Sequence, residues 1–154
     1  MLNISDSAPQ FSLLSSEGSA INLANLKGKN VVLYFYPKDD TPGCTIEAQD
    51  FNNQLSKFSN LDCIILGISK DTFSSHCKFV NKYSLNFLLL SDEAGEVCQK
   101  YQVLAEKSMF GKKYIGIDRS TFLIDKMGKI AKVWRSVKVS GHVDEVLAEV
   151  AKLS

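Results

Sequence analysis

The feature that most constrains the fold of this chain is a repeated alternation between short apolar runs and amphipathic segments of helical periodicity. The first such run, Val31–Tyr36, is continuous, β-branched and aromatic, which is typical of a strand buried on both faces. Further runs with strand character follow at Cys63–Ile68, Phe87–Leu90, Thr121–Ile124 and Ile130–Trp134. Because parallel strands need long crossover connections, the alternation predicts parallel pairs joined by helices.

Helical spacing of apolar residues fills the intervals between these runs. A helix is expected from Pro42 to about Phe58, and Asp71 is expected to cap the next one. Two more helices are expected at Glu93–Tyr101 and His142–Leu153. The segment Gln102–Asp118 has mixed polarity and two glycines, and a loop is predicted there.

Turn signals add two hairpins to this pattern. Phe11–Leu14 and Ala20–Leu23 flank a Ser-Glu-Gly turn, and the turn at 125–128 joins the last two strands. The resulting prediction is an α/β fold, a three-layer α/β/α sandwich with a mixed central sheet and an N-terminal β-hairpin, which is the plan of the thioredoxin fold. No linker, repeat or low-complexity segment divides the chain, so residues 1–154 are expected to form a single domain.

Charge and hydropathy exclude several function classes. Lys plus Arg total 18 against 17 Asp plus Glu, a net charge of +1, which provides no electrostatic attraction to nucleic acid or to an anionic membrane. The apolar runs are too short to span a bilayer. Residues Met1–Gln10 have neither a basic segment nor an apolar core, so no secretory signal is expected and the predicted location is the cytoplasm.

The chain has four cysteines, Cys44, Cys63, Cys77 and Cys98. None of them forms a CxxC pair, which argues against a zinc ribbon and against a thioredoxin-type dithiol. In a cytoplasmic protein the default expectation is four reduced thiols. The functional question is therefore which thiol is reactive.

Cys44 has the placement of a reactive thiol. It follows a buried strand and a proline-containing loop, with Thr41 as the expected N-cap and Pro42 in the first helical turn. Free backbone N–H groups and the helix dipole favour an anion at this position, and the thiolate is the nucleophilic form of cysteine. Placement alone also allows the alternative that Cys44 is a small residue packed at a helix start.

The surrounding residues favour the reactive alternative. Pro37, Thr41 and Cys44 form the pattern Pro-x-x-x-Thr-x-x-Cys, which resembles the active-site signature of the peroxiredoxins. The longer string Phe-Tyr-Pro-Lys-Asp-Asp-Thr-Pro-Gly-Cys-Thr resembles the subgroup called bacterioferritin comigratory protein, or peroxiredoxin Q. Further similarity to that subgroup covers most of the chain, at Ala8–Leu13, Leu66–Asp71 and Gly116–Asp125.

The resemblance implies a thiol peroxidase that reduces hydrogen peroxide and organic hydroperoxides through a cysteine sulfenic acid, without metal, haem or flavin. It implies that Cys44 is the peroxidatic cysteine, that Thr41 and Arg119 hold the thiolate and the peroxide, and that Pro37 shields the site from water. Fixed donors of this kind would stabilise the charge that develops on the leaving oxygen. Glu47 lies one turn after Cys44 and could orient Arg119; the alternative is simply a favourable acid near a helix N-terminus.

The sequence departs from many members of that subgroup at the resolving thiol. They carry a second cysteine five residues after the first, where this chain has Gln49. Cys63 and Cys98 are expected to pack in the core, and Cys77 is the candidate resolving thiol, although it does not match the position used by other members. The alternative is a one-cysteine cycle in which thioredoxin, glutaredoxin or a small thiol such as glutathione reduces the sulfenate directly.

Two other functions stay open on sequence alone. A thioredoxin-like disulfide reductase would need the missing CxxC motif, whereas a non-enzymatic redox sensor or holdase could use the same reactive thiol. His76 and His142 are expected to be helix-surface residues, because no cluster of metal ligands accompanies either. The subgroup resemblance favours a monomer, with a dimer as the alternative.

Overall fold

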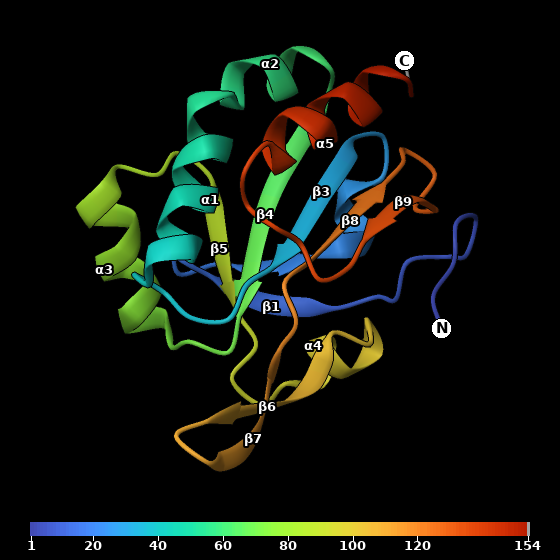
Figure 1. Cartoon of the computed structure of the whole chain (residues 1–154). Coiled ribbons are helices and arrows are strands. Elements are labelled where there is room, and N and C mark those ends of the chain that lie inside the picture. Colours follow the sequence, from blue (N-terminus) through green and yellow to red (C-terminus); the bar gives the residue numbers. More distant parts are fainter. Residues whose placement is uncertain (154) are drawn as a thin grey trace.

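The computed structural model describes residues 1–153 and contains a seven-stranded mixed sheet in the order β2-β1-β5-β4-β3-β8-β9 (Figure 1). Strands β3, β4 and β5 are parallel, whereas β1, β2, β8 and β9 pair antiparallel with their neighbours. The strands of the sheet are β1 (Ser12–Ser15), β2 (Ala20–Asn22), β3 (Asn30–Phe35), β4 (Cys63–Ser69), β5 (Leu88–Ser91), β8 (Ser120–Ile124) and β9 (Ile130–Trp134). The predicted mixed sheet and both predicted hairpins are confirmed.

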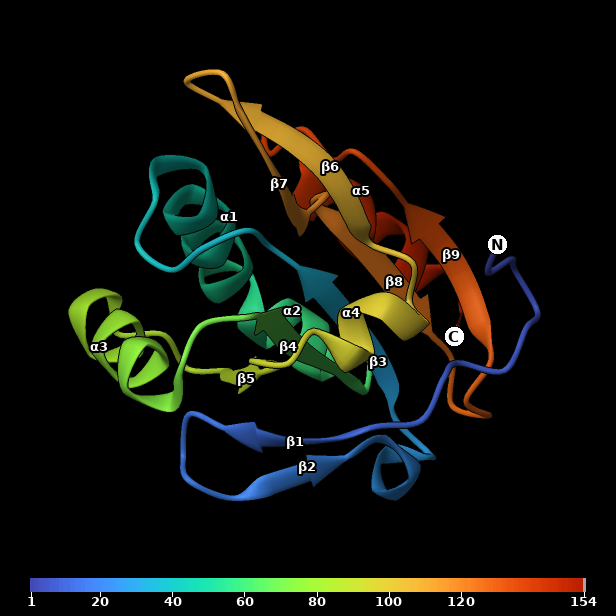
Figure 2. The same cartoon turned by 90° about the horizontal axis from the view of Figure 1, so that it is seen from below.

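Helices cover both faces of this sheet, which confirms the three-layer α/β/α sandwich (Figure 2). They are α1 (Pro42–Asn53), α2 (Leu55–Asn60), α3 (Phe73–Tyr83), α4 (Glu96–Lys100) and α5 (His142–Ala151), and a short 3-10 helix, η1 (Leu23–Leu26), follows β2. All six residues of β3 are buried, and the five after Asn30 belong to the continuous apolar run that predicts a strand buried on both faces.

Alternate residues of β3 enter two separate hydrophobic cores. Val32 and Tyr34 belong to a core formed with α1, α2, α3 and α5, which includes Cys44. Leu33 and Phe35 belong to the core on the opposite face, with α4 and the N-terminal segment. The reactive-thiol candidate therefore lies on the face that carries most of the helices.

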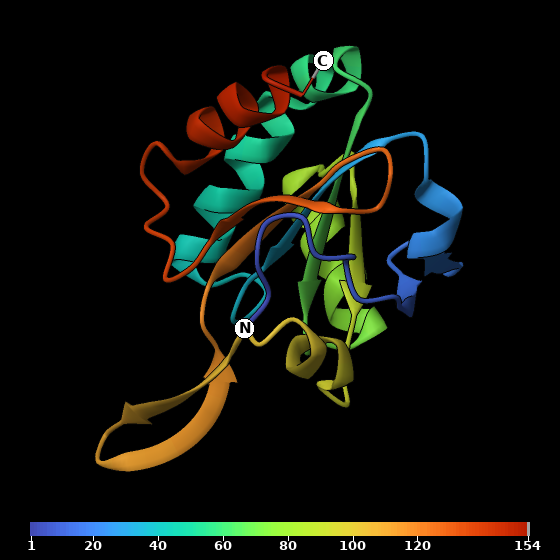
Figure 3. The same ribbon diagram turned by 90° about the vertical axis from the view of Figure 1, so that its right-hand side faces the viewer.

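Three local predictions differ from the structure. The segment expected to be a loop contains a two-stranded antiparallel arm, β6 (Leu104–Met109) and β7 (Lys112–Ile117), which projects from the body (Figure 3). The long helix expected from Pro42 is broken at Gln54 into α1 and α2. Thr72, rather than Asp71, caps α3, because its hydroxyl accepts the N–H of Ser75 while the carboxylate of Asp71 accepts the hydroxyl of Ser69.

None of the helices among residues 1–153 is long and apolar enough to cross a membrane.

Gly67 is packed tightly against side chains from both neighbouring strands, β3 and β5. It pairs with Tyr34 across β3 and β4. A Cβ atom on Gly67 would lie 2.8 Å from Cδ2 of Leu89 and 2.9 Å from Cζ of Tyr34, and both side chains are buried. The absence of a side chain at this position therefore lets the ring of Tyr34 lie across the sheet.

We expect Gly67→Ala to destabilise the protein by about 1–3 kcal/mol, because neither buried neighbour has room to move. Equilibrium denaturant unfolding measures this change. Gly116→Ala is the matched control: its Cβ would contact Tyr114 and Lys107, whose side chains belong to the projecting arm. If Gly67→Ala lowers the free energy of unfolding by no more than the control does, the packing account is contradicted.

Candidate active site

Strand pairing brings together the ends of two segments that are far apart in the sequence. Phe35, the last residue of β3, pairs with Ser120, the first residue of the antiparallel strand β8. Arg119 precedes Ser120, so it lies beside the point at which the chain leaves β3 and enters the active-site loop, Pro37–Thr41. The backbone carbonyl of Arg119 also accepts the N–H of Val137, which fixes this position from the other side.

Cys44 occupies the first turn of α1, as the sequence predicts. Thr41 is the N-cap residue and Pro42 is the first helical residue. The N–H groups of this turn have no acceptor within the helix, so they present positive charge to the neighbourhood of the thiol. The residue is only 1% exposed. Its sulfur is therefore close to a helix N-terminus and shielded from bulk water.

Arg119 connects Cys44 to Glu47. One terminal nitrogen, Nη2, donates to Sγ of Cys44 at 3.5 Å, and the other, Nη1, donates to Oε1 of Glu47 at 2.7 Å. The side chain of Arg119 is 16% exposed and that of Glu47 is fully buried. The planar guanidinium can hold both groups at once because its N–H donors diverge in a fixed geometry.

Gly43 makes this approach feasible. A Cβ atom on Gly43 would lie 3.1 Å from Nη2 of Arg119, which is tighter than ordinary packing. A larger residue would therefore push the guanidinium away from the sulfur of Cys44. Sequence analysis included Gly43 in the motif but gave it no role, because the arginine that needs the space lies on a distant strand.

Burial determines the protonation behaviour of Glu47. Loss of hydration raises the pKa of its carboxyl from 4.5 to about 7, and the charge of Arg119 and its hydrogen bond oppose that rise only in part. Oε2 of Glu47 has no hydrogen-bond partner among the described residues, consistent with an incompletely compensated buried carboxyl. For Arg119, burial lowers the pKa, but Glu47 and Cys44 raise it, and the net shift is upward. The arginine thus stays charged.

Thr41 and Pro37 lie at the open side of the site. The hydroxyl of Thr41 donates to the carbonyl oxygen of Lys38 at 2.8 Å, and it caps no backbone N–H of the helix. Both residues line a cavity of about 770 Å³ that continues along the β6–β7 arm. Lys38 also lines it, and the arm contributes the other lining residues, with apolar side chains, lysines and one glycine: Lys107, Met109, Phe110, Lys112, Lys113, Tyr114, Gly116 and Ile117.

The other three cysteines lie outside this group. Cys63 and Cys98 are buried, as expected for core residues, and burial raises the pKa of both thiols, that of Cys63 to about 12. Cys77 is partly exposed, and its thiol donates to the carbonyl oxygen of Ser16 in the β1–β2 turn at 3.5 Å. All four cysteines are free thiols.

The prediction that His76 and His142 are surface residues is wrong. His76 is completely buried and His142 is 3% exposed. Nε2 of His142 lies 2.8 Å from Oγ1 of Thr121, and burial lowers the pKa of His142 to about 4, so it is neutral at physiological pH. Both histidines are hydrogen-bonded to residues of distant segments, and helix periodicity does not reveal such contacts.

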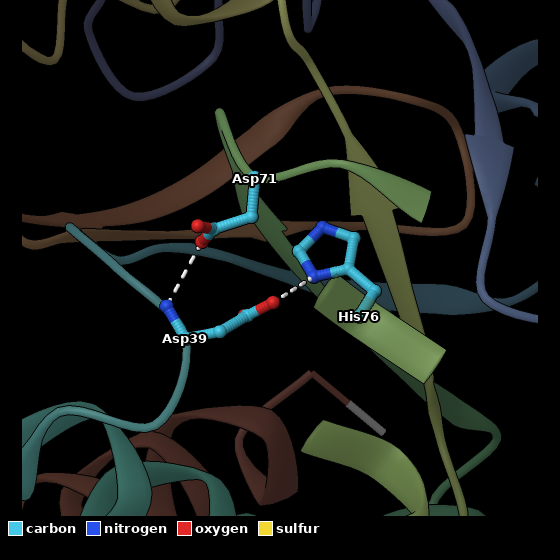
Figure 4. Close-up of side chains that lie close together, drawn as sticks. All are labelled: Asp39, Asp71 and His76. Carbon is cyan, nitrogen blue, oxygen red and sulfur yellow. Dashed lines mark hydrogen bonds and ion pairs between the residues drawn. The ribbon is translucent and has the colours of Figure 1, made fainter. Parts of the chain in front are cut away.

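His76 belongs to a cluster with Asp39 and Asp71 beneath the active-site loop (Figure 4). Their ligand atoms lie within 4.8 Å of one another, but hydrogen-bond donors already occupy them. One carboxylate oxygen of Asp71, Oδ2, accepts the hydroxyl of Ser69 at 2.6 Å and the backbone N–H of Asp39 at 2.9 Å. The cluster is therefore built as a hydrogen-bond network rather than as a metal site.

We expect the burial of Glu47 to make folding stability depend on pH. Its raised pKa means that the folded protein binds more protons than the unfolded chain between pH 4.5 and 7. The free energy of unfolding therefore includes a stabilising contribution from protonated Glu47 at low pH, and this contribution is lost as the pH rises through 7. Its full size is at most about 3 kcal/mol.

Denaturant unfolding across this pH range measures the contribution. Glu47→Gln cannot titrate, so its free energy of unfolding relative to wild type should change across the range. Glu93→Gln, at an exposed position, is the control and should follow the wild-type profile. Parallel wild-type and Glu47→Gln profiles would contradict a titrating buried carboxyl.

Comparisons with known proteins agree with this geometry. Residues 4–133 match the model of the AhpC/TSA family. Peroxiredoxin Bcp of Bacillus subtilis is 46% identical over 153 residues, covering 99% of this chain and 98% of that protein.

Solved structures extend the likeness to three dimensions. Peroxiredoxin Q of Xylella fastidiosa superposes with a TM-score of 0.93 at 38% identity, covering 99% of this chain and 97% of that one. The bacterioferritin comigratory protein of Xanthomonas campestris, studied for alkyl peroxide reduction, superposes with a TM-score of 0.90 at 41% identity and the same coverage. This chain therefore belongs to the AhpC/TSA family and, within it, to the bacterioferritin comigratory protein, or peroxiredoxin Q, subgroup of the peroxiredoxins.

Proposed function

We propose that this protein is a thiol-dependent peroxidase and that Cys44 is the residue that attacks the peroxide. The observation that carries the proposal is the sulfur of Cys44 in the first turn of α1, with Nη2 of Arg119 at 3.5 Å. The thiolate forms an S–O bond as the O–O bond breaks. The leaving oxygen departs as hydroxide or alkoxide and takes up a proton, and Cys44 becomes a sulfenic acid.

The fixed positive groups around Cys44 suit this reaction. Negative charge moves from the sulfur to the leaving oxygen, and donors already in position stabilise it without reorganising. We assign this role to the guanidinium of Arg119 and to the N–H groups that begin α1. Thr41 would join them if its hydroxyl turned from the carbonyl of Lys38 toward the peroxide, a rotation about one side-chain bond.

The neighbouring groups have supporting roles in this proposal. Glu47 holds the far side of the Arg119 guanidinium at 2.7 Å, which fixes the direction in which Nη2 points. Pro37 stands between the site and solvent at the cavity that opens beside Thr41. The apolar part of that cavity gives an organic hydroperoxide a surface to contact, so we include such compounds among the substrates along with hydrogen peroxide.

An external thiol completes the cycle in this proposal. Cys63 and Cys98 are buried, so neither is placed to attack a sulfenic acid without large movement. The thiol of Cys77 donates to Ser16 in the β1–β2 turn. Phe79 of the same helix, and not Cys77, packs in the core that includes Cys44. Reduction would then come from a thiol carrier such as thioredoxin or glutaredoxin, or from glutathione, and Cys77 is the alternative resolving thiol.

Steady-state peroxide consumption tests the reductant and the function together. Hydrogen peroxide and an alkyl hydroperoxide are each supplied with thioredoxin, glutaredoxin or glutathione in turn. Repeated turnover with any of them supports a peroxidase, whereas a single oxidation without turnover would indicate a redox sensor. We also propose a cytoplasmic monomer, which cell fractionation and light scattering would test.

We expect Cys44→Ser to abolish peroxide consumption, because a serine hydroxyl is not ionised at neutral pH and cannot form a sulfenic acid. Cys63→Ser, at a buried site away from Arg119, is the matched control and should keep most of the turnover per folded molecule. Retained turnover in Cys44→Ser would refute the assignment of the reactive thiol.

The Cys77→Ser variant distinguishes a one-cysteine cycle from a cycle in which Cys77 is the resolving thiol. If an external thiol reduces Cys44 directly, this variant should turn over like wild type, and peroxide treatment should yield no Cys44–Cys77 disulfide by peptide mapping. Loss of turnover together with a mapped Cys44–Cys77 disulfide in wild type would establish Cys77 as the resolving thiol instead.

A further inference from the structure

The active-site loop is attached to α3 at its two aspartates. Asp39 is bonded to His76 near the start of α3, and its own N–H donates to Asp71 just before that helix (Figure 4). The hydroxyl of Ser75 also donates to the carboxylate of Asp39. Asp40 bonds Lys82 and Tyr83 near the end of α3. The loop that leads into Cys44 therefore cannot move without breaking contacts to α3.

The two attachments differ in strength because they differ in exposure. The side chains of Asp40 and Lys82 are 41% and 58% exposed, so water screens that ion pair and it contributes little. The side chains of His76 and Asp39 are 0% and 4% exposed. A pair of this kind is costly to break, because breaking it leaves a buried charge without a partner.

Hydrogen-bond geometry fixes the charge of His76. Nε2 lies 3.0 Å from the carbonyl oxygen of Leu90, which can only accept, so Nε2 carries a hydrogen. Nδ1 lies 2.7 Å from Oδ2 of Asp39. The hydroxyl of Tyr36 donates to Oδ1 of Asp39 at 2.5 Å, so the oxygen of that hydroxyl, 3.4 Å from Nδ1, is also available only as an acceptor.

Acceptors at both ring nitrogens make His76 an imidazolium. Asp39 is its carboxylate counter-ion, because three donors converge on that group, from Tyr36, Ser75 and His76, and donors favour the ionised form. Tyr36 and Asp39 face His76 from the chain after β3, Asp71 faces it from the chain after β4, and β5 contributes the carbonyl of Leu90.

We propose that His76 is a positioning residue for Cys44: as a buried imidazolium it holds Asp39, and thereby the active-site loop and the start of α1, in the closed arrangement. Without the hydrogen on Nδ1, a lone pair would face the Asp39 carboxylate and the loop would lose this attachment. The consequence of this inference rests on the proposed function: Cys44 is 1% exposed, so an external thiol can reach its sulfur only when this region opens.

The rate of Cys44 alkylation by iodoacetamide, followed on the Cys44 peptide by mass spectrometry, reports this opening in the full-length reduced protein. The informative quantity is the rate of a variant divided by that of wild type at neutral pH. We expect His76→Gln to react about tenfold faster than wild type, because a neutral amide leaves the Asp39 carboxylate without its counter-ion.

Ser75→Ala is the matched control. It removes a neutral donor from the same carboxylate and leaves the counter-ion in place, so its rate should stay within about twofold of wild type. A His76→Gln rate no faster than that of Ser75→Ala would reduce His76 to a packing residue and overturn the proposal.

Nitrogen-15 NMR of the wild-type imidazole tests the charge directly and does not depend on a variant that folds. Both ring nitrogens should carry hydrogens at neutral pH, and Asp39→Asn should convert His76 to the neutral ring. A neutral His76 in wild type at neutral pH would overturn the proposal. None of these measurements uses peroxide, so failure of the peroxidase assay and failure of this inference are separate outcomes.

Discussion

The contact between the guanidinium of Arg119 and the sulfur of Cys44 is the interaction on which the site depends. It requires Arg119 to stand at the start of β8, beside the end of β3, and the pairing of Phe35 with Ser120 puts it there. It also requires Gly43, whose missing side chain leaves room for Nη2. The environment of this sulfur atom thus depends on the register of β3 with β8, on the glycine at position 43 and on the N-terminus of α1.

Burial gives this contact its strength and also its cost. The sulfur of Cys44, the guanidinium of Arg119 and the carboxyl of Glu47 are largely withdrawn from water, so they interact more strongly than they would at the surface. The same withdrawal raises the pKa of Glu47 to about 7, and one of its oxygens has no hydrogen-bond partner within residues 1–153. The site is therefore held in a defined geometry at some expense in stability, which the two hydrophobic cores on either side of β3 offset.

The sequence predicts those parts of the structure that depend on local pattern. The buried strand β3, the start of α1 after Thr41 and the place of Cys44 in the first helical turn follow from residues that are adjacent in the chain. The resemblance to a family supplied Arg119, which composition and periodicity alone would have left as an ordinary surface arginine. Its contact with Cys44 spans 75 positions of sequence.

Where local pattern failed, long-range contacts decided the outcome. His76 is separated by 37 positions from Asp39, and only the folded chain shows that the two form a buried pair. The β6–β7 arm was missed because a two-stranded ribbon with both faces largely exposed has no apolar alternation to detect. The break at Gln54 and the cap at Thr72 are choices between neighbouring residues, which sequence signals resolve poorly.

The most direct test of the central contact is the rate constant for oxidation of Cys44 by hydrogen peroxide in a single turnover, compared between wild type, Arg119→Ala and Arg119→Lys. If the guanidinium stabilises the negative charge that develops on the leaving oxygen of the peroxide, the rate constant of Arg119→Ala should be lower by about 100-fold. Arg119→Lys should recover only part of that loss, because an ammonium cannot hold Cys44 and Glu47 together as a planar fork does. An Arg119→Ala rate close to that of wild type would contradict the account.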